Sequence, residues 1–201
     1  MTFNCLSLQY LGYGAFSQKI HDIASQQRIP INASIELTMR CNLRCKHCYI
    51  PLQLRTQKPD KELSFDEFQR IFSELADAGC LWMMLTGGEP LLRPDFLNLY
   101  DMAKQEGFIV SLFTNGTLLN EAIIDHLAEW RPFSIEISLY GATEKTYENI
   151  TGVPGSFKRC MRGIELCLDR GLPLKLKTVL ITLNEHELQK MKEFSKSLGL
   201  D

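Results

Sequence analysis

The sequence predicts an α/β fold in which a parallel sheet closes only part of a barrel. From residue 33 onward, short β-type runs alternate with capped helical segments, which is typical of βα units. The alternation continues for about five units, so the fifth strand would be left as an open edge. Several runs also alternate polar with branched apolar residues, which gives the expected sheet one polar face.

The expected elements follow one another at regular spacing. The capping box Ser64-x-x-Glu67 starts the first helix of the repeat, and Gly107 and Gly199 end later ones. The expected strands cover residues 33–39, 81–86, 109–114, 134–139 and 174–181. The helices that follow them are expected at 65–78, at 94–107, from residue 120, at 156–171 and at 184–199.

The two ends of the chain fit this repeat less well. Residues 1–32 are interpreted as an N-terminal extension with a short helix at 16–26, and residues 33–201 as the main domain. Leu200 and Asp201 would begin a sixth strand. The main domain is therefore expected to be incomplete at its C-terminal end, and the sequence to be a fragment or a truncated product.

The polar face of the sheet favours a ligand cavity. In a closed eight-stranded barrel the interior is filled by branched apolar side chains, and buried polar groups there would be costly without a polar partner. One alternative is that these residues simply line the exposed face of an open sheet. The residues expected to point inward are Ser34, Glu36, Thr38, Ser134, Glu136, Ser138, Lys175 and Lys177.

Composition and charge exclude several classes of protein. The chain is 45% hydrophobic and 23% charged, which suits one globular domain with a substantial core. A formal net charge of -2 gives no electrostatic footprint for nucleic acid. No apolar run has membrane-spanning length, and the first residues lack a signal-peptide pattern, so a cytoplasmic location is expected.

Three clustered cysteines carry the chemistry. Cys41, Cys45 and Cys48 form a C-x3-C-x2-C motif directly after the first expected strand. Thiolates are soft ligands that suit iron–sulfur clusters, zinc or cuprous copper. A [4Fe–4S] cluster usually takes four cysteines, so three would leave one iron open to a ligand from outside the protein.

A structural zinc site and a disulfide framework are the alternatives. A closed zinc site needs a second ligand pair, and a disulfide framework needs paired cysteines in a secreted chain. The remaining cysteines are single and scattered: Cys5, Cys80, Cys160 and Cys167. Both alternatives are therefore weaker than the iron–sulfur interpretation.

Two further motifs follow the cysteines in a fixed order. Gly87-Gly88-Glu89-Pro90 follows the second expected strand, and Thr114-Asn115-Gly116 follows the third. In this order the motifs resemble the radical S-adenosylmethionine (SAM) superfamily, from about Ser34 to the end of the chain. The resemblance implies a partial (β/α)6 barrel, a [4Fe–4S] cluster and SAM as cofactors.

The resemblance also assigns roles to individual residues. Cys41, Cys45 and Cys48 would each hold one iron, and SAM would chelate the fourth. The residues implied to contact SAM are Gly87, Gly88 and Glu89 at its amino group, His47 and Tyr49 at its adenine, and Asn115 and Ser138 at its sugar or methionine end.

One position departs from the family pattern. Many relatives carry an arginine after strand four that pairs with the SAM carboxylate, whereas residues 147–152 here contain none. Lys177, on the inward side of strand five, is the expected replacement, although lysine lacks the bidentate geometry of arginine. The alternative is that Lys175 and Lys177 only solvate an edge strand.

The implied activity is reductive cleavage of SAM to a 5′-deoxyadenosyl radical that takes a hydrogen atom from a substrate. The sequence around the motifs is similar to the peptide-modifying branch of the family, with its SPASM or twitch maturases, so a peptide or protein substrate is expected. Radical SAM chemistry on a small molecule and a non-catalytic fragment that binds SAM or metal are the alternatives. Arg40, Arg44 and Lys46 surround the cysteines and would dock an acidic electron donor such as flavodoxin or ferredoxin; the alternative is that they are solvated surface residues.

Overall fold

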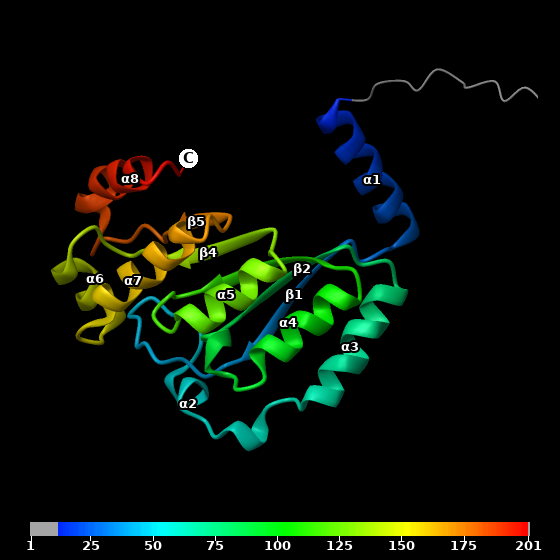
Figure 1. The fold of residues 1–201 in the computed structure, drawn as a ribbon, viewed down its shortest axis with the longest axis horizontal. Helices are drawn as coiled ribbons and strands as arrows, with labels where there is room; N and C mark the ends of the chain where they lie inside the picture. The colour runs from blue at the N-terminus through cyan, green and yellow to red at the C-terminus, as the bar shows by residue number, and fades with distance from the viewer. Residues whose placement is uncertain (1–11, 201) are drawn as a thin grey trace, which may run out of the picture.

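One five-stranded parallel sheet forms the centre of the protein (Figure 1). The structure is a computed structural model and describes residues 12–200. The strand order follows the chain order, β1-β2-β3-β4-β5, which confirms the predicted succession of βα units and the partial barrel. The strands are β1 (Asn32–Thr38), β2 (Trp82–Gly87), β3 (Ile109–Thr114), β4 (Ser134–Ser138) and β5 (Leu174–Lys177).

Four helices that alternate with the strands cover one face of this sheet (Figure 1). They are α3 (Phe65–Asp77), α4 (Phe96–Gln105), α5 (Glu121–Glu129) and α7 (Ser156–Asp169). The predicted capping box starts α3, because Ser64 Oγ accepts from the Glu67 amide at 3.3 Å and Glu67 Oε2 accepts from the Ser64 amide at 2.8 Å. The Asn120 side chain caps α5 in the same way, accepting from the Ile123 amide at 3.0 Å.

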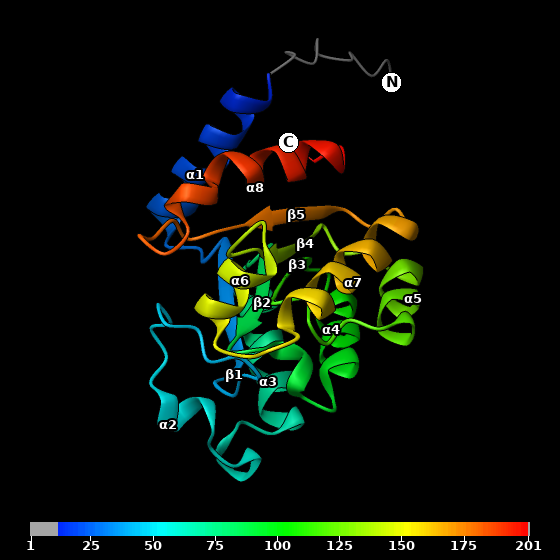
Figure 2. The same cartoon turned by 90° about the vertical axis from the view of Figure 1, so that its left-hand side faces the viewer.

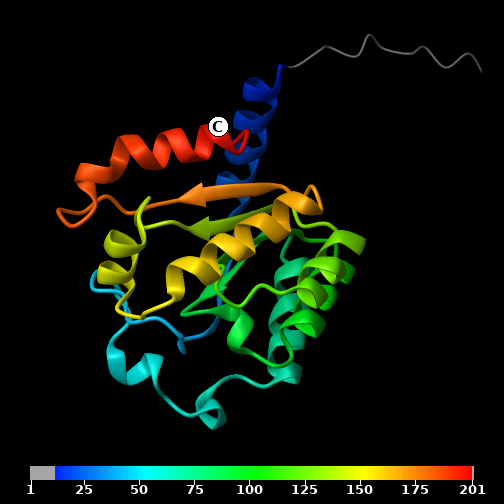
Figure 3. The ribbon, with the colours of Figure 1, turned by 60° about the vertical axis from the view of Figure 1, so that its left-hand side comes forward.

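The remaining helices lie at the margins. They are α1 (Tyr13–Gln27), α2 (Leu52–Arg55), α6 (Glu144–Thr151) and α8 (Leu188–Ser197), with short 3₁₀ turns at Pro59–Lys61, Pro90–Leu92 and Glu185–Glu187. Figure 2 shows α8 beyond β5, at the edge of the sheet, and Figure 3 shows α1 projecting away from the sheet. None of the helices between residues 12 and 200 is long and apolar enough to cross a membrane.

The core lies between the sheet and its helices. Alternate residues of the central strands point toward the helices and are fully or almost fully buried: Met83, Leu85, Val110, Leu112, Ile135 and Ile137. They pack against helix residues such as Phe72, Leu99 and Ile164. Burial of a side chain of this size stabilises a fold by about 1.5–3 kcal/mol, so the apolar half of the alternation fixes which face the helices cover.

The other face of the sheet carries polar side chains along β1, β4 and β5, as predicted. Glu136 and Lys177 line a cavity on this inner face together with Ser34 and Ser111. The polar prediction was incomplete for β2 and β3, which place Trp82, Met84 and Phe113 on the same face. Because this face carries both charged and apolar groups, it can receive a ligand of mixed character.

The largest differences from the predicted element boundaries are in β5 and α8. β5 ends at Lys177 instead of residue 181, because the amide of Leu139 makes the last ladder bond to Lys177 O at 2.8 Å and the chain then turns away. α8 begins at Leu188 and not at Asn184, whose side chain donates to the carbonyls of Tyr140 and Val179 instead of capping a helix.

A further difference is α6, which, like the short helix α2, was not predicted. Thr143 Oγ1 accepts from the Thr146 amide at 3.3 Å to cap it, and Gly152 ends it in a left-handed conformation. At the ends of the chain, Cys5 and Asp201 lie outside the described residues. Leu200 lies in no strand, because its amide bonds back to Ser195 O at 3.0 Å.

Candidate cofactor site

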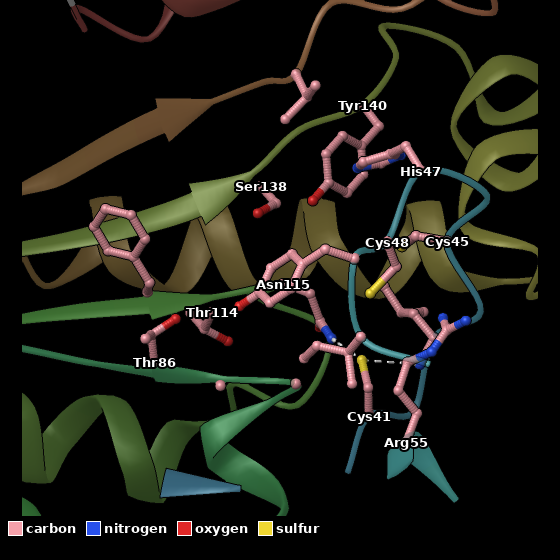
Figure 4. A pocket seen from close by; sticks show the side chains of 17 residues that line it. Cys41, Cys45, His47, Cys48, Arg55, Thr86, Thr114, Asn115, Ser138 and Tyr140 are labelled. Atoms are coloured by element: carbon pink, nitrogen blue, oxygen red, sulfur yellow. Dashed lines mark hydrogen bonds between the residues drawn. The ribbon is translucent and has the colours of Figure 1, made fainter. Parts of the chain in front are cut away.

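The three cysteines of the motif line one cavity at the carboxyl end of the sheet. They lie on the loop that leaves β1, and the cavity that they line has a volume of about 270 Å³ (Figure 4). The Cys41 amide donates to Arg55 O at 3.2 Å, so the first cysteine is tied to the end of α2. The Cys48 amide donates to Cys45 O at 3.2 Å, which closes the tight turn between the other two.

The cysteine loop is also held from the side by α6. The Arg44 amide donates to Thr151 O at 2.8 Å, and the Lys46 amide donates to Ile150 O at 3.0 Å. These bonds use carbonyls that the last turn of a helix leaves without an intrahelical partner. A short helix that follows β4 therefore fixes the backbone of a loop that follows β1.

The glycine pair approaches this loop along its backbone. The Gly88 amide donates to Thr38 O at 2.7 Å, and the Glu89 amide donates to Arg40 O at 2.8 Å. A Cβ atom on Gly87 would lie 2.3 Å from Thr38 O, and one on Gly88 would lie 2.2 Å from Arg40 O. Only glycine lets the two loops touch here, and both glycines line the cysteine cavity.

Glu89 has a different environment from the one expected. Its side chain is fully buried and does not line the cavity. One carboxylate oxygen accepts from Thr114 Oγ1 at 2.7 Å and from the Leu91 amide at 3.2 Å, and the other accepts from the Asn115 amide at 2.7 Å. The carboxylate thus connects the loop after β2 to the loop after β3.

Asn115 continues this connection to the cysteines. Its Nδ2 donates to Asn42 Oδ1 at 2.8 Å and lies 3.9 Å from the Cys41 sulfur, while its Oδ1 accepts from the Thr117 amide at 2.9 Å. Asn115 also lines the cavity. A chain of hydrogen bonds therefore runs from buried Glu89 through Asn115 to the loop that carries Cys41.

The buried carboxyl of Glu89 predicts a pH dependence of stability. Burial raises the pKa of Glu89 from its usual 4.5 to about 7, against the opposing effect of its hydrogen bonds. The native state then binds this proton more tightly than the unfolded state, so this contribution to stability is complete below about pH 4.5 and is lost as pH rises through 7.

We expect Glu89→Gln to remove that dependence. A shift of this size corresponds to roughly 3 kcal/mol at about 1.4 kcal/mol per pKa unit. Urea unfolding of both proteins at pH 5 and at pH 8 should therefore show wild type losing up to that amount relative to the variant between the two conditions. A difference between the two proteins that does not change with pH would contradict this prediction.

Aromatic rings form another wall of the cavity. His47 and Tyr49 line it, and Tyr140, to which the sequence analysis gave no role, lies against His47 with the two ring centres 4.5 Å apart. The Nδ1 atom of His47 is buried without a hydrogen-bond partner among the described residues, and burial lowers the pKa of this ring. A neutral imidazole with a free ring nitrogen suits contact with a polar heterocycle.

The cation on the cavity wall is not the one expected. Lys177 does not line the cavity, and its Nζ lies 3.2 Å from Glu136 Oε2 on the inner face of the sheet. Arg55, at the end of α2, lines the cavity, and its Nε is buried without a hydrogen-bond partner in the described part of the chain. Ser138, which pairs in register with Lys177, does line the cavity at the end of β4 (Figure 4).

The three thiols would need a cationic partner to be ionised together. Burial, together with the charges of Cys41 and Cys48, raises the pKa of Cys45 to about 12, so three free thiolates are unfavourable here. A cationic metal core would reverse the effect of those charges. Within residues 12–200 no three His, Cys, Asp or Glu side chains are placed to hold one metal ion.

The three scattered cysteines within the described residues belong to the core. Cys160 and Cys167 on α7 are fully buried, and Cys80, which precedes β2, is 8% exposed. Both α7 thiols face the hydrophobic core, as their spacing predicted.

Comparison of the sequence with known proteins finds one matching family and several similar proteins. The model of the family described as the Radical SAM superfamily matches residues 35–195. The chain is 36% identical over 164 residues to "AdoMet-dependent heme synthase" of Methanosarcina barkeri, covering 82% of this chain and 46% of that protein. It is 32% identical over 170 residues to "PqqA peptide cyclase" of Granulibacter bethesdensis, covering 85% of this chain and 45% of that protein.

Solved structures share the fold. Streptococcus suis SuiB matches with a TM-score of 0.76 and 19% identity, both with S-adenosylmethionine bound and with its precursor peptide SuiA bound. The matches cover 97% and 100% of this chain and 46% of the SuiB chain. The chain thus spans about half the length of the relatives that it matches.

Proposed function

The chain belongs to the Radical SAM superfamily, and we propose that it forms the core of an enzyme that cleaves SAM reductively at a [4Fe–4S] cluster to modify a peptide. Membership of this superfamily implies both cofactors. When bound, the cluster and SAM supply the electron and the radical that removes a hydrogen atom from the substrate. The protein's own contribution is to bind, orient and shield these groups.

One observation carries the proposal. Three thiols from a single loop line the same cavity as a glycine pair whose backbone approach leaves no room for a Cβ atom. Cys41, Cys45 and Cys48 would hold the cluster, and the three-cysteine set leaves one iron for SAM.

The other cavity residues would then position SAM. Gly87 and Gly88 present backbone to the cavity and would face the SAM amino group, while His47 and Tyr49 would contact adenine. Ser138 and Asn115, at the ends of neighbouring strands, would border the sugar or the methionine end. Glu89 would act indirectly, by holding Asn115 and the Cys41 loop in place.

A peptide is the proposed substrate. Support comes from the relative named PqqA peptide cyclase and from the SuiB structure with its precursor peptide. A small molecule is the second candidate, because the relative named AdoMet-dependent heme synthase is 36% identical to this chain. Both candidates use the same cofactor site and differ in what the inner face of the sheet would bind.

An acidic electron donor such as flavodoxin or ferredoxin is the proposed redox partner. Arg44 and Lys46 are exposed on the cysteine loop and could face such a donor. Arg40 is excluded from this role, because Glu62 binds it with two hydrogen bonds of 2.8 and 3.0 Å. The thiols must stay reduced to bind iron, so we place the protein in the cytoplasm.

Anaerobic reconstitution tests the proposal. Protein incubated with iron and sulfide should bind about four iron atoms per chain and show broad visible absorption. Dithionite and SAM should then yield 5′-deoxyadenosine, measured by chromatography. Cluster formation without 5′-deoxyadenosine would support the non-catalytic fragment, and a colourless protein with bound zinc would overturn the proposal.

A further inference from the structure

A second cavity lies on the inner face of the sheet, next to the cavity that the three cysteines line, which we call the cofactor cavity. Its volume is about 460 Å³, and Phe113 lines both cavities. Trp82 and Met84 give it apolar walls, and Glu136 and Lys177 give it a charged end. A group bound there would lie beside whatever occupies the cofactor cavity.

Glu136 is an unusual residue for this position. It is 8% exposed, and its Oε1 is held by the hydroxyl of Ser134 at 3.1 Å. Its Oε2 is buried and makes no hydrogen bond to any described residue. A buried charge costs free energy unless it is paired, so this carboxylate needs a cation close by.

Two lysines of β5 lie close enough to Glu136 to pair with its carboxylate. Lys177 Nζ lies 3.2 Å from Glu136 Oε2, and Lys175 Nζ lies 3.7 Å from Glu136 Oε1. The side chains of both lysines remain about half exposed, at 55% and 52%. One carboxylate thus faces two ammonium groups, so these three side chains together carry a net charge of +1.

From this charge surplus we infer that the inner-face cavity binds a carboxylate group of the substrate, with Lys177 as its partner. Glu136 holds the lysine in place, and Trp82 and Met84 pack against the apolar part of the incoming side chain. The inference rests on the proposed function, because it names what the same enzyme would accept. A glutamate or aspartate of a peptide and a free small carboxylate share this chemistry.

Equilibrium dialysis of the reconstituted protein tests the inference. The probes are two eight-residue glycine–serine peptides with a central glutamate or glutamine, and free glutarate. A charge-assisted hydrogen bond should make the glutamate peptide bind about tenfold tighter than the glutamine peptide. Glutarate binding as tightly as the glutamate peptide would identify a small carboxylate as the source, and much weaker binding would identify a peptide.

Matched variants assign the preference to Lys177. Lys177→Gln should reduce the tenfold preference to about twofold or less, and Lys177→Arg should keep most of it. Lys190→Gln, the same charge change on the exposed side of α8, should leave it unchanged. Equal binding of the two peptides to wild type, or a Lys177→Gln variant that keeps the preference but loses SAM affinity, would overturn the inference.

Failure of the proposed function would look different. Release of 5′-deoxyadenosine by wild type needs neither probe peptide, so it is measured separately. If wild type releases no 5′-deoxyadenosine but still prefers the glutamate peptide, the proposed enzymatic activity is contradicted and the carboxylate site is supported.

Discussion

Cys45→Ala will abolish cluster binding and SAM cleavage. Cys45 provides one of the three thiols of the cofactor cavity. The described residues that line this cavity include no fourth cysteine that could replace it. Because each thiolate would bind its own iron in the proposed cluster, loss of one ligand would open a second iron to solvent. We expect iron to fall from about four atoms per chain to less than about one, with loss of the visible bands and of 5′-deoxyadenosine release.

Cys80→Ala is the matched control. Cys80 is also buried, but it precedes β2 at the opposite end of the sheet from the cavity. This variant should lose some stability, on the order of 1 kcal/mol, and keep its iron and its spectrum. A Cys45→Ala protein that retains a full cluster would disprove the assignment of the ligands.

Gly88→Ala will destabilise the protein and weaken SAM binding together. The added Cβ would meet Arg40 O at 2.2 Å and Met39 O at 2.5 Å, and backbone atoms cannot move aside as the end of a flexible side chain can. We expect the free energy of unfolding to fall by about 2–4 kcal/mol. Separation of the two loops would also widen the cofactor cavity, so SAM affinity measured by calorimetry should fall at least tenfold.

Gly14→Ala supplies the comparison for a glycine that makes no close contact. A Cβ on Gly14 meets no atom of the described chain within 4 Å, and the residue lies within α1. Alanine there should raise helix stability by up to about 1 kcal/mol and leave SAM binding alone. Equal effects of the two substitutions would show that the packing at Gly88 is not what matters.

The sequence predicted the sheet well because its signals are local. Alternation of Ile135, Glu136 and Ile137 along β4 gives one apolar and one polar face, and the apolar residues are fully buried against the helices. Capping by Ser64 and Asn120 is likewise readable from a few neighbouring residues. Such features depend little on the rest of the fold.

Contacts between residues that are far apart in the sequence were harder to predict. Glu89 and Asn115 are 26 positions apart, and only the folded chain brings the carboxylate of one onto the amide of the other. The alternation along β5 correctly placed Lys177 on the inner face of the sheet. It could not show that the ammonium group of Lys177 lies beside Glu136 of the neighbouring strand. Side-chain pairing between strands cannot be read from the alternation within one strand.

The helix α6 was missed for a related reason. It has only eight residues and its apolar positions do not form a long stripe, so the 3.6-residue pattern is weak. Thr143 before it and Gly152 after it are ordinary start and stop signals and would have located it. Its contact with the cysteine loop could not have been found from those signals, because the partners are about a hundred residues away.

That distant contact sets an order of events during biosynthesis. Arg44 and Lys46 leave the ribosome long before Ile150 and Thr151, the residues whose carbonyls fix their amides. Synthesis adds roughly 5–20 residues per second, so the cysteine loop spends several seconds without its clamp. Iron delivered to the nascent chain in that interval would meet three unarranged thiols, and metal loading should therefore follow the emergence of α6 from the ribosome.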